Sequence, residues 1–262
     1  MILGAAMSDL VRFTIADLVG TIILNRPDKF NALDIPMLDA LAAALEAAEA
    51  SSARVILVRG EGKGFCAGGD IDAWSAMSAA DFQIKWVRHG HRVFDRLARL
   101  RQPTIAVLSG HALGGGLELA AACDFRVAEK HVKLGLPETS LGVVPGWSGT
   151  QRAVRRFGAQ TVRRMALGGD IVLAPQALAL GLVDRLAETG EGLTEAVAWA
   201  DRIAARGPLA SEAAKMMINI AEGEETAHAA ETLASGFIAM TADLKAGVNA
   251  FRAKRQAEFD RA

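Results

Sequence analysis

The chain has no tyrosine and few cysteines, and each shortage excludes a class of chemistry. Among its 262 residues no tyrosine is available as an acid or a nucleophile. The two cysteines, Cys66 and Cys123, are too few for a disulfide framework and are typical of a reducing compartment. They stand alone, and the five histidines are scattered, so no zinc-binding spacing occurs. We therefore expect no metal site.

The chain also lacks an excess of charge and a long hydrophobic run. Its 29 basic and 30 acidic side chains give a net charge of -1, which disfavours nucleic-acid binding. The longest apolar stretch, residues 103–123, contains His111 and Glu118, and its uncharged part is too short to cross a bilayer. The first ten residues lack the basic and apolar segments of a secretory signal. We expect a cytoplasmic protein that binds neither nucleic acid nor a membrane.

Apolar runs alternate with glycine turns and helical periods in the first two-thirds of the chain. The runs predict strands at residues 20–25, 54–59, 103–108 and 123–127. Asp34 is placed to cap a helix whose apolar face repeats every three or four residues, and a second helical stretch covers about 80–100. This alternation predicts an α/β fold with a mostly parallel sheet covered by helices.

The last third of the chain is mainly helical. Helical periods cover residues 193–205, 211–220 and about 227–256, and only residues 182–183 suggest a further strand. We predict a core over residues 1–200 and a helical region over residues 201–262. That region is expected to pack on the core or on a neighbouring subunit.

Two motifs that suggest other enzyme classes are incomplete. The segment around Ser148 resembles a nucleophile elbow, but Thr150 stands where that motif needs glycine. We interpret Ser148 as a helix N-cap instead. The glycines at 60–64 lack the spacing of a phosphate-binding loop.

Two complete glycine turns follow predicted strands. The first is FCAGGDI at 65–71, and the second is GHALGGGLE at 110–118. Ligands bind at the carboxyl ends of strands in open α/β sheets, and glycine lets backbone N–H groups approach a ligand closely. The second turn leads into a helix, whose N-terminus favours a negative oxygen. Two such donors facing one carbonyl would form an oxyanion hole.

Two glutamates, Glu118 and Glu138, accompany these turns in apolar surroundings. Neighbouring carboxyl groups in an apolar site have raised pKa values that separate from each other, which suits one acid and one base acting on a single water. The alternative is structural: Glu118 caps its helix and Glu138 forms a surface salt bridge.

Together these segments resemble the crotonase superfamily, the enoyl-CoA hydratase/isomerase family. The resemblance covers residues 11–259 and is carried by Asn25-Arg-Pro27 with Asn31-Ala-Leu33, FCAGGDI, GHALGGGLELAAACDFRVA, KLGLPETSLGVVPGWSGTQR and the closing FRAKRQAEF. It implies a crotonase (ClpP/crotonase-like) spiral of ββα units with a helical C-terminal region that forms trimers, with hexamers as pairs of trimers.

The resemblance also implies roles for individual residues. Gly69 and Gly115 match the residues whose N–H groups hold the thioester oxygen, and Glu118 and Glu138 match the paired glutamates of enoyl-CoA hydratases. Glu118 is expected to activate water and Glu138 to donate a proton to C2, a division that the sequence alone leaves open. Residues predicted to contact coenzyme A, which enters as part of the substrate, are Ala67, Asp70, Ile71, Lys29 and Lys254.

The leading expectation is an enoyl-CoA hydratase that acts on trans-2-enoyl-CoA thioesters without a metal or redox cofactor. Its rivals are an enoyl-CoA isomerase, which needs one carboxylate, another crotonase-type acyl-CoA enzyme, and a non-catalytic acyl-CoA-binding protein. One departure from the family is Trp147, where hydratases often carry a small residue. Its indole either narrows the acyl pocket or is a plain core residue.

Overall fold

A six-stranded sheet forms the centre of the first of two compact units, residues 1–212 and 213–262. The computed structural model describes residues 9–225 and 227–259. The strands are β1 Val11–Ala16, β2 Val19–Leu24, β3 Val55–Gly60, β4 Thr104–Leu108, β5 Ala112–Leu113, β6 Phe125–Glu129, β7 Lys133–Gly135, β8 Ile171–Leu173 and β9 Arg185–Ala187. The longer helices are α1 Ile35–Ala50, α4 Arg88–Ala98, α5 Gly115–Ala122, α7 Ala159–Ala166, α9 Gly192–Ala204, α10 Pro208–Ala221, α11 Ala227–Ala239 and α12 Ala242–Arg252. The shorter ones are η1 Pro27–Lys29, α2 Ile71–Trp74, α3 Ala79–Asp81, η2 Phe82–Val87, η3 Glu138–Leu141, α6 Arg152–Phe157 and α8 Ala174–Ala179.

The large sheet has the strand order β1-β2-β3-β4-β6-β9, and only the β1–β2 pair is antiparallel. A smaller sheet has the order β5-β7-β8. The mostly parallel sheet and its four predicted strands are therefore confirmed. The strand predicted at residues 182–183 is wrong: both residues are buried in the connection between α8 and β9, and β9 begins at Arg185.

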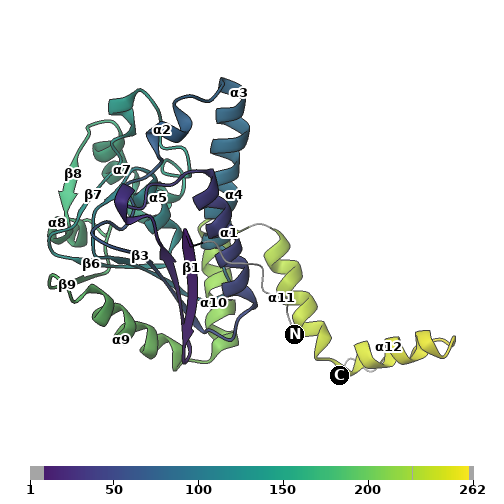
Figure 1. The fold of residues 1–262 in the computed structure, drawn as a ribbon. Helices are drawn as coiled ribbons and strands as arrows, with labels where there is room; N and C mark the ends of the chain where they lie inside the picture. The colour runs from purple at the N-terminus through teal and green to yellow at the C-terminus, as the bar shows by residue number, and fades with distance from the viewer. Residues whose placement is uncertain (1–8, 226, 260–262) are drawn as a thin grey trace. The chain divides into compact units, whose positions relative to one another are not determined.

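Both faces of the large sheet are covered at its centre, which explains why the central strands β3 and β4 are mainly apolar. Side chains of β3 alternate between the two faces. Ile56 and Val58 join the core that includes residues of α1, α4 and α5. Val55 and Leu57 join a second core with alanines of α9. Figure 1 shows α9 on one side of the sheet and α1 and α4 on the other.

The predicted start of a helix after Asp34 is confirmed. The Asp34 carboxylate accepts a hydrogen bond from the Met37 N–H at 2.8 Å and begins α1. The single helix predicted over 227–256 is wrong, because Thr241 caps a new helix, α12, through the Leu244 N–H. None of the described helices is long and apolar enough to span a membrane.

Candidate active site

The two glycine turns lie side by side at the carboxyl ends of β3 and β4. The Cys66 N–H donates to the His111 carbonyl, and the Leu113 N–H donates to the Cys66 carbonyl, both at 3.4 Å. A Cβ at Gly116 would lie 2.0 Å from the Cys66 carbonyl oxygen. Only glycine therefore allows this contact, which joins two turns that are distant in the sequence.

Two backbone donors of these turns, the N–H groups of Gly69 and Gly115, have no hydrogen-bond acceptor among the described residues. Both glycines line the same cavity. Gly115 is the first residue of α5, where an N–H has no partner within the helix and the helix dipole is positive. Gly68, at φ +94°, lets the first turn approach the second, since its Cβ would lie 3.0 Å from the Gly115 nitrogen. One carbonyl oxygen could accept from both donors.

Glu118 lies in the first turn of α5 and is 3% exposed. Its Oε1 accepts hydrogen bonds from the backbone N–H groups of Trp147 at 2.7 Å and Gly149 at 2.6 Å. A Cβ at Gly149 would lie 2.7 Å from that oxygen, so this approach too requires glycine. The two donors hold the carboxyl group in place and favour its charged form.

The residue between these two donors, Ser148, adopts a left-handed backbone conformation with φ +80°. Its predicted role as a helix N-cap is wrong. The helix α6 begins at Arg152, and the Ser148 hydroxyl lies 3.2 Å from Nδ1 of His91. The left-handed conformation is uncommon outside glycine and accompanies the turn that directs both N–H groups toward Glu118.

Glu138 begins the short helix η3 and lines the cavity. Both of its carboxyl oxygens are buried, and neither has a hydrogen-bond partner within residues 9–225 and 227–259. A Cβ at Gly114 would lie 3.1 Å from its Oε1. A buried polar group without a partner is unusual in a native protein and points to a ligand or water at this position. The structural alternative, with a cap at Glu118 and a surface salt bridge at Glu138, is wrong for both residues.

The pKa values of the two carboxyl groups are raised and coupled. Burial raises the pKa of Glu118 to about 8; the charge of Glu138 adds to this effect, and the Trp147 and Gly149 N–H groups oppose it. Burial raises the pKa of Glu138 to about 7. Because the charges interact, these values belong to the pair, which keeps one proton between about pH 7 and pH 8. Such a pair can supply one acid and one base.

The raised pKa of Glu138 predicts a pH-dependent stability. An unfolded glutamate ionises near pH 4.3, whereas burial keeps Glu138 protonated up to about pH 7. Between these values the native state binds more protons than the unfolded state, so stability falls as the pH rises. Glu138→Gln removes this loss, so at pH 8 we expect the variant to melt at a higher temperature than the wild type. The increase should be roughly 2–4 °C for each kcal/mol gained in the free energy of unfolding. The difference should shrink toward pH 5.

The control for this experiment is Glu46→Gln, which changes an exposed side chain. Melting curves at pH 5 and pH 8 should show no pH-dependent gain for that variant. A Glu138→Gln gain that is equal at both pH values would contradict the raised pKa of Glu138.

The cavity between these groups has a volume of about 400 Å³. The glycine turns and the two glutamates form one part of its lining. An aromatic part consists of Trp74, Phe82, Trp86 and Trp147. Exposed apolar side chains of Ile71, Leu141 and Val144 lie at its mouth. A mainly apolar cavity with a few polar groups at one place is typical of a small-molecule site.

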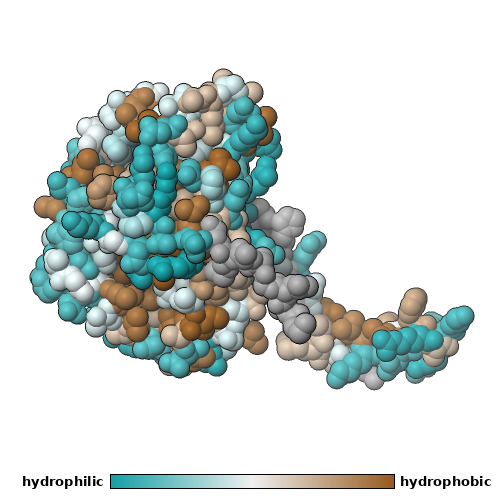
Figure 2. Space-filling model, viewed as in Figure 1, coloured by the Kyte–Doolittle hydropathy of each residue, from teal (hydrophilic) through white to brown (hydrophobic). Residues whose placement is uncertain are grey.

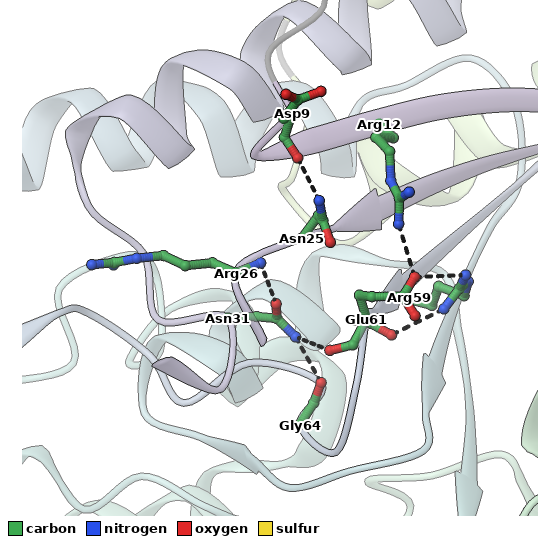
Figure 3. Close-up of polar contacts among 9 residues, drawn as sticks. Asp9, Arg12, Asn25, Arg26, Asn31, Arg59, Glu61 and Gly64 are labelled. Carbon is green, nitrogen blue, oxygen red and sulfur yellow. Dashed lines mark hydrogen bonds and ion pairs between the residues drawn. The ribbon is translucent and has the colours of Figure 1, made fainter. Parts of the chain in front are cut away.

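Asp70 holds the first glycine turn in place, and it is not part of the cavity lining. Its carboxylate forms a 2.7 Å ion pair with Arg26 and caps α2 through the Asp72 N–H. Asn31, at φ +57° and fully buried, donates to the Glu61 and Gly64 carbonyls and accepts from the Arg26 N–H (Figure 3). Arg26 and Asn31 therefore anchor the segment that carries Gly69.

Of the other residues predicted to contact coenzyme A, some line the cavity and some do not. Ala67 and Ile71 line the cavity. Lys29 is outside it and forms an exposed 3.0 Å ion pair with Asp72, whose hydrogen bond raises the pKa of the lysine. Lys254 follows α12 in the second unit. Of these two lysines, Lys29 belongs to the unit that contains the cavity and does not line it.

Sequence reasoning did not identify the residues of η2, a π-helix. Its wider turn places Phe82, Trp86 and Val87 on the cavity. Such segments occur frequently at functional sites. Arg152 was also missed: it is 1% exposed, forms a 2.7 Å ion pair with Asp95, and its charge partly counteracts the rise in the pKa of Glu118. The signal in the sequence that could have identified Arg152 was its position at the end of the GWSGTQR segment, which is part of the family resemblance.

The fold and the cavity together define an α/β protein of the crotonase type. A family model described as enoyl-CoA hydratase/isomerase matches residues 14–262, and the chain belongs to this family. It is 36% identical over 250 residues to a crotonyl-CoA hydratase of Syntrophomonas wolfei, covering 92% of this chain and 94% of that protein. It is 34% identical over 244 residues to a short-chain-enoyl-CoA hydratase of Clostridium acetobutylicum, covering 92% and 93%.

The crystal structure of an enoyl-CoA hydratase from Bacillus anthracis superimposes with a TM-score of 0.80 at 31% identity, covering 95% of this chain and 98% of that one. The predicted crotonase fold is therefore confirmed, and the chain is a crotonase-family protein.

Proposed function

We propose that this protein is an enoyl-CoA hydratase that adds water across the double bond of trans-2-enoyl-CoA thioesters. The observation that carries the proposal is the pair of buried carboxyl groups, Glu118 and Glu138, on one cavity. Beside them lie two backbone N–H groups for which the described part of the chain provides no acceptor. The hydratase names of the relatives support the same reaction.

In this proposal the thioester oxygen accepts hydrogen bonds from the N–H groups of Gly69 and Gly115. Negative charge moves onto that oxygen as water attacks C3, so these bonds are stronger in the transition state than in the ground state. The reaction then needs a proton taken from water and a proton delivered to C2.

The hydrogen bonds around the glutamates favour one division of these roles. Glu118 has two N–H donors on Oε1, which stabilise its charged form, and its other oxygen can take the proton of water. The carboxyl oxygens of Glu138 have no hydrogen-bond partner among the described residues, and we assign to this group the proton that passes to C2. After one turnover Glu118 holds a proton from water, and exchange with solvent restores the starting state.

An isomerase and a non-catalytic acyl-CoA binder are the competing functions. An isomerase needs one carboxylate to move a proton, and a binder needs neither. The second carboxyl group, buried at a cost in stability, favours hydration. The test is the loss of ultraviolet absorbance of the conjugated thioester when water adds to trans-2-enoyl-CoA. An unchanged absorbance with every chain length would overturn the hydratase proposal.

We also propose that five residues support the binding of coenzyme A: Ala67, Ile71, Asp70, Lys29 and Lys254. Ala67 lines the cavity, which supports contact of its carbonyl with the adenine. Lys29 is exposed, and a phosphate could compete with Asp72 for it. Asp70 would act indirectly, through its hold on the glycine turn.

We also propose that the chain forms homotrimers or hexamers. Several large apolar residues of the second unit are exposed, among them Phe237, Met240, Phe251 and Phe259. An apolar hollow of about 430 Å³ lies within that unit between α12 and Phe259. Figure 2 shows hydrophobic and hydrophilic residues on different sides of α12. Exposed apolar surface of this kind marks an interaction site.

Light scattering at micromolar concentration should therefore give a mass of at least three chains. A stable monomer would contradict the proposed assembly.

A further inference from the structure

Tryptophan is concentrated at the cavity. The chain has four tryptophans and no tyrosine. Trp74, Trp86 and Trp147 line the cavity, whereas Trp199 packs on Phe125 and on the Arg185 guanidinium elsewhere. The indoles therefore shape the space that the acyl group of a substrate would occupy.

The indole of Trp147 is fixed on all sides. It is 3% exposed, and its ring centre lies 5.0 Å from that of Trp86 and 5.2 Å from that of Phe94. Its Nε1–H donates to the Trp86 carbonyl at 3.3 Å. The indole is thus held by packing and by a hydrogen bond, and it cannot turn away without disrupting the core.

A glycine inside helix α4 makes room for this indole. A Cβ at Gly90 would lie 2.1 Å from Nε1 and 2.4 Å from Cε2 of Trp147. Glycine is unfavourable in a helix interior, so its presence here has a packing reason. Gly90 and Trp147 are therefore complementary in shape, because the indole of Trp147 occupies the space that a side chain at position 90 would fill.

The same indole lies next to the reacting groups. A Cβ at Gly115 would lie 2.8 Å from its Cζ3, and the Trp147 backbone N–H donates to Glu118. On the other turn, a Cβ at Gly69 would lie 2.7 Å from Cζ2 of Trp86, which is 5% exposed. An acyl chain whose carbonyl lies between Gly69 and Gly115 therefore meets the packed indole pair within a few bonds.

We propose that Trp147, seated against Gly90, and Trp86 close the inner end of the acyl subsite and restrict this protein to short acyl groups. The inference rests on the proposed hydratase function and names its substrate class: enoyl thioesters about the size of butenoyl and hexenoyl. A longer chain has no room beyond the indoles and would have to bend back toward the mouth of the cavity at Leu141 and Val144.

The test compares butenoyl-, hexenoyl-, octenoyl- and decenoyl-CoA as substrates of the wild type, Trp147→Leu and Trp199→Leu. One methylene changes kcat/KM by roughly 10- to 200-fold in a hydrophobic pocket. We expect the wild type to use decenoyl-CoA at least about a hundredfold less well than butenoyl-CoA. Trp147→Leu should reduce that ratio at least about tenfold, and Trp199→Leu should keep it. The backbone N–H that holds Glu118 is present in each variant.

Ratios of kcat/KM within one variant do not depend on the fraction of folded protein. If Trp147→Leu does not fold, Trp147→Phe offers a smaller change in volume. The inference is overturned if the wild type uses decenoyl-CoA as well as butenoyl-CoA, or if the folded Trp147 variant keeps the wild-type ratio.

A binding experiment separates this inference from the proposed function. Tryptophan fluorescence reports the binding of saturated butanoyl-CoA and decanoyl-CoA without catalysis, and no tyrosine contributes to the signal. Tighter binding of butanoyl-CoA by a protein that hydrates no substrate would refute the hydratase proposal and support the size limit. Equal binding and equal turnover of all lengths would refute the size limit alone.

Discussion

Glu118→Gln and Glu138→Gln are each expected to lower the turnover of enoyl-CoA hydration by at least about a hundredfold, the usual scale of acid–base catalysis. Glutamine keeps the size of the side chain, and its carbonyl oxygen can still accept the Trp147 and Gly149 N–H groups at position 118. What it lacks is a carboxyl group that gains or loses a proton. The loss should therefore lie in kcat.

The measurement is the rate of absorbance loss with saturating butenoyl-CoA, and the control is the binding of butanoyl-CoA. Binding should change little, because a saturated thioester requires no proton transfer. Glu46→Gln serves as the matched exposed variant and should keep wild-type turnover. Near wild-type turnover in either cavity variant would show that the two-carboxyl mechanism is wrong.

Removal of the Gly115 N–H is expected to lower kcat by roughly 10²–10³, because this donor acts most strongly when charge develops on the thioester oxygen. Proline removes the donor, and its fixed φ is tolerated in the first turn of a helix. Any side chain at position 115 meets Trp147, however: a Cβ would lie 2.8 Å from the indole. The kcat of Gly115→Pro with Trp147 present would therefore reflect both the steric effect and the loss of the N–H donor.

The comparison is best made in a Trp147→Ala background, where the indole is absent. Gly115→Ala/Trp147→Ala keeps the N–H, and Gly115→Pro/Trp147→Ala lacks it, so the two differ mainly in the donor. Circular dichroism and melting curves must show that both fold. Equal kcat values for the two folded double variants would exclude Gly115 as an oxyanion donor.

Local patterns were sufficient to predict much of the first unit. The central strands β3 and β4 are mainly apolar runs, because both faces of the sheet are covered there, and a glycine turn follows each of them. Gly69 and Gly115 follow two neighbouring strands, β3 and β4, and parallel topology brings their ends together. Glu118 and Glu138 were expected beside them because they match the paired glutamates of the family. Topology and the family resemblance together therefore predicted these four residues on one site.

Interactions between distant segments could not be predicted in this way. Asp70 resembles a ligand contact in its motif, but its partner is Arg26, which lies far away in the sequence. The helical pattern over 227–256 has no proline, so only the capping geometry of Thr241 reveals the break between α11 and α12.

The sequence by itself determined the family, the sheet and the four groups proposed for the chemistry, because each depends on residue types at short spacings. Only the tertiary structure decided what Trp147 does. It is both a core residue and a wall of the cavity, since its indole lies between Gly90 on one helix and Gly115 at the start of another. The pKa values of Glu118 and Glu138 likewise depend on burial and on each other's charge. Burial and mutual distance are properties of folded segments, and no spacing along the chain contains them.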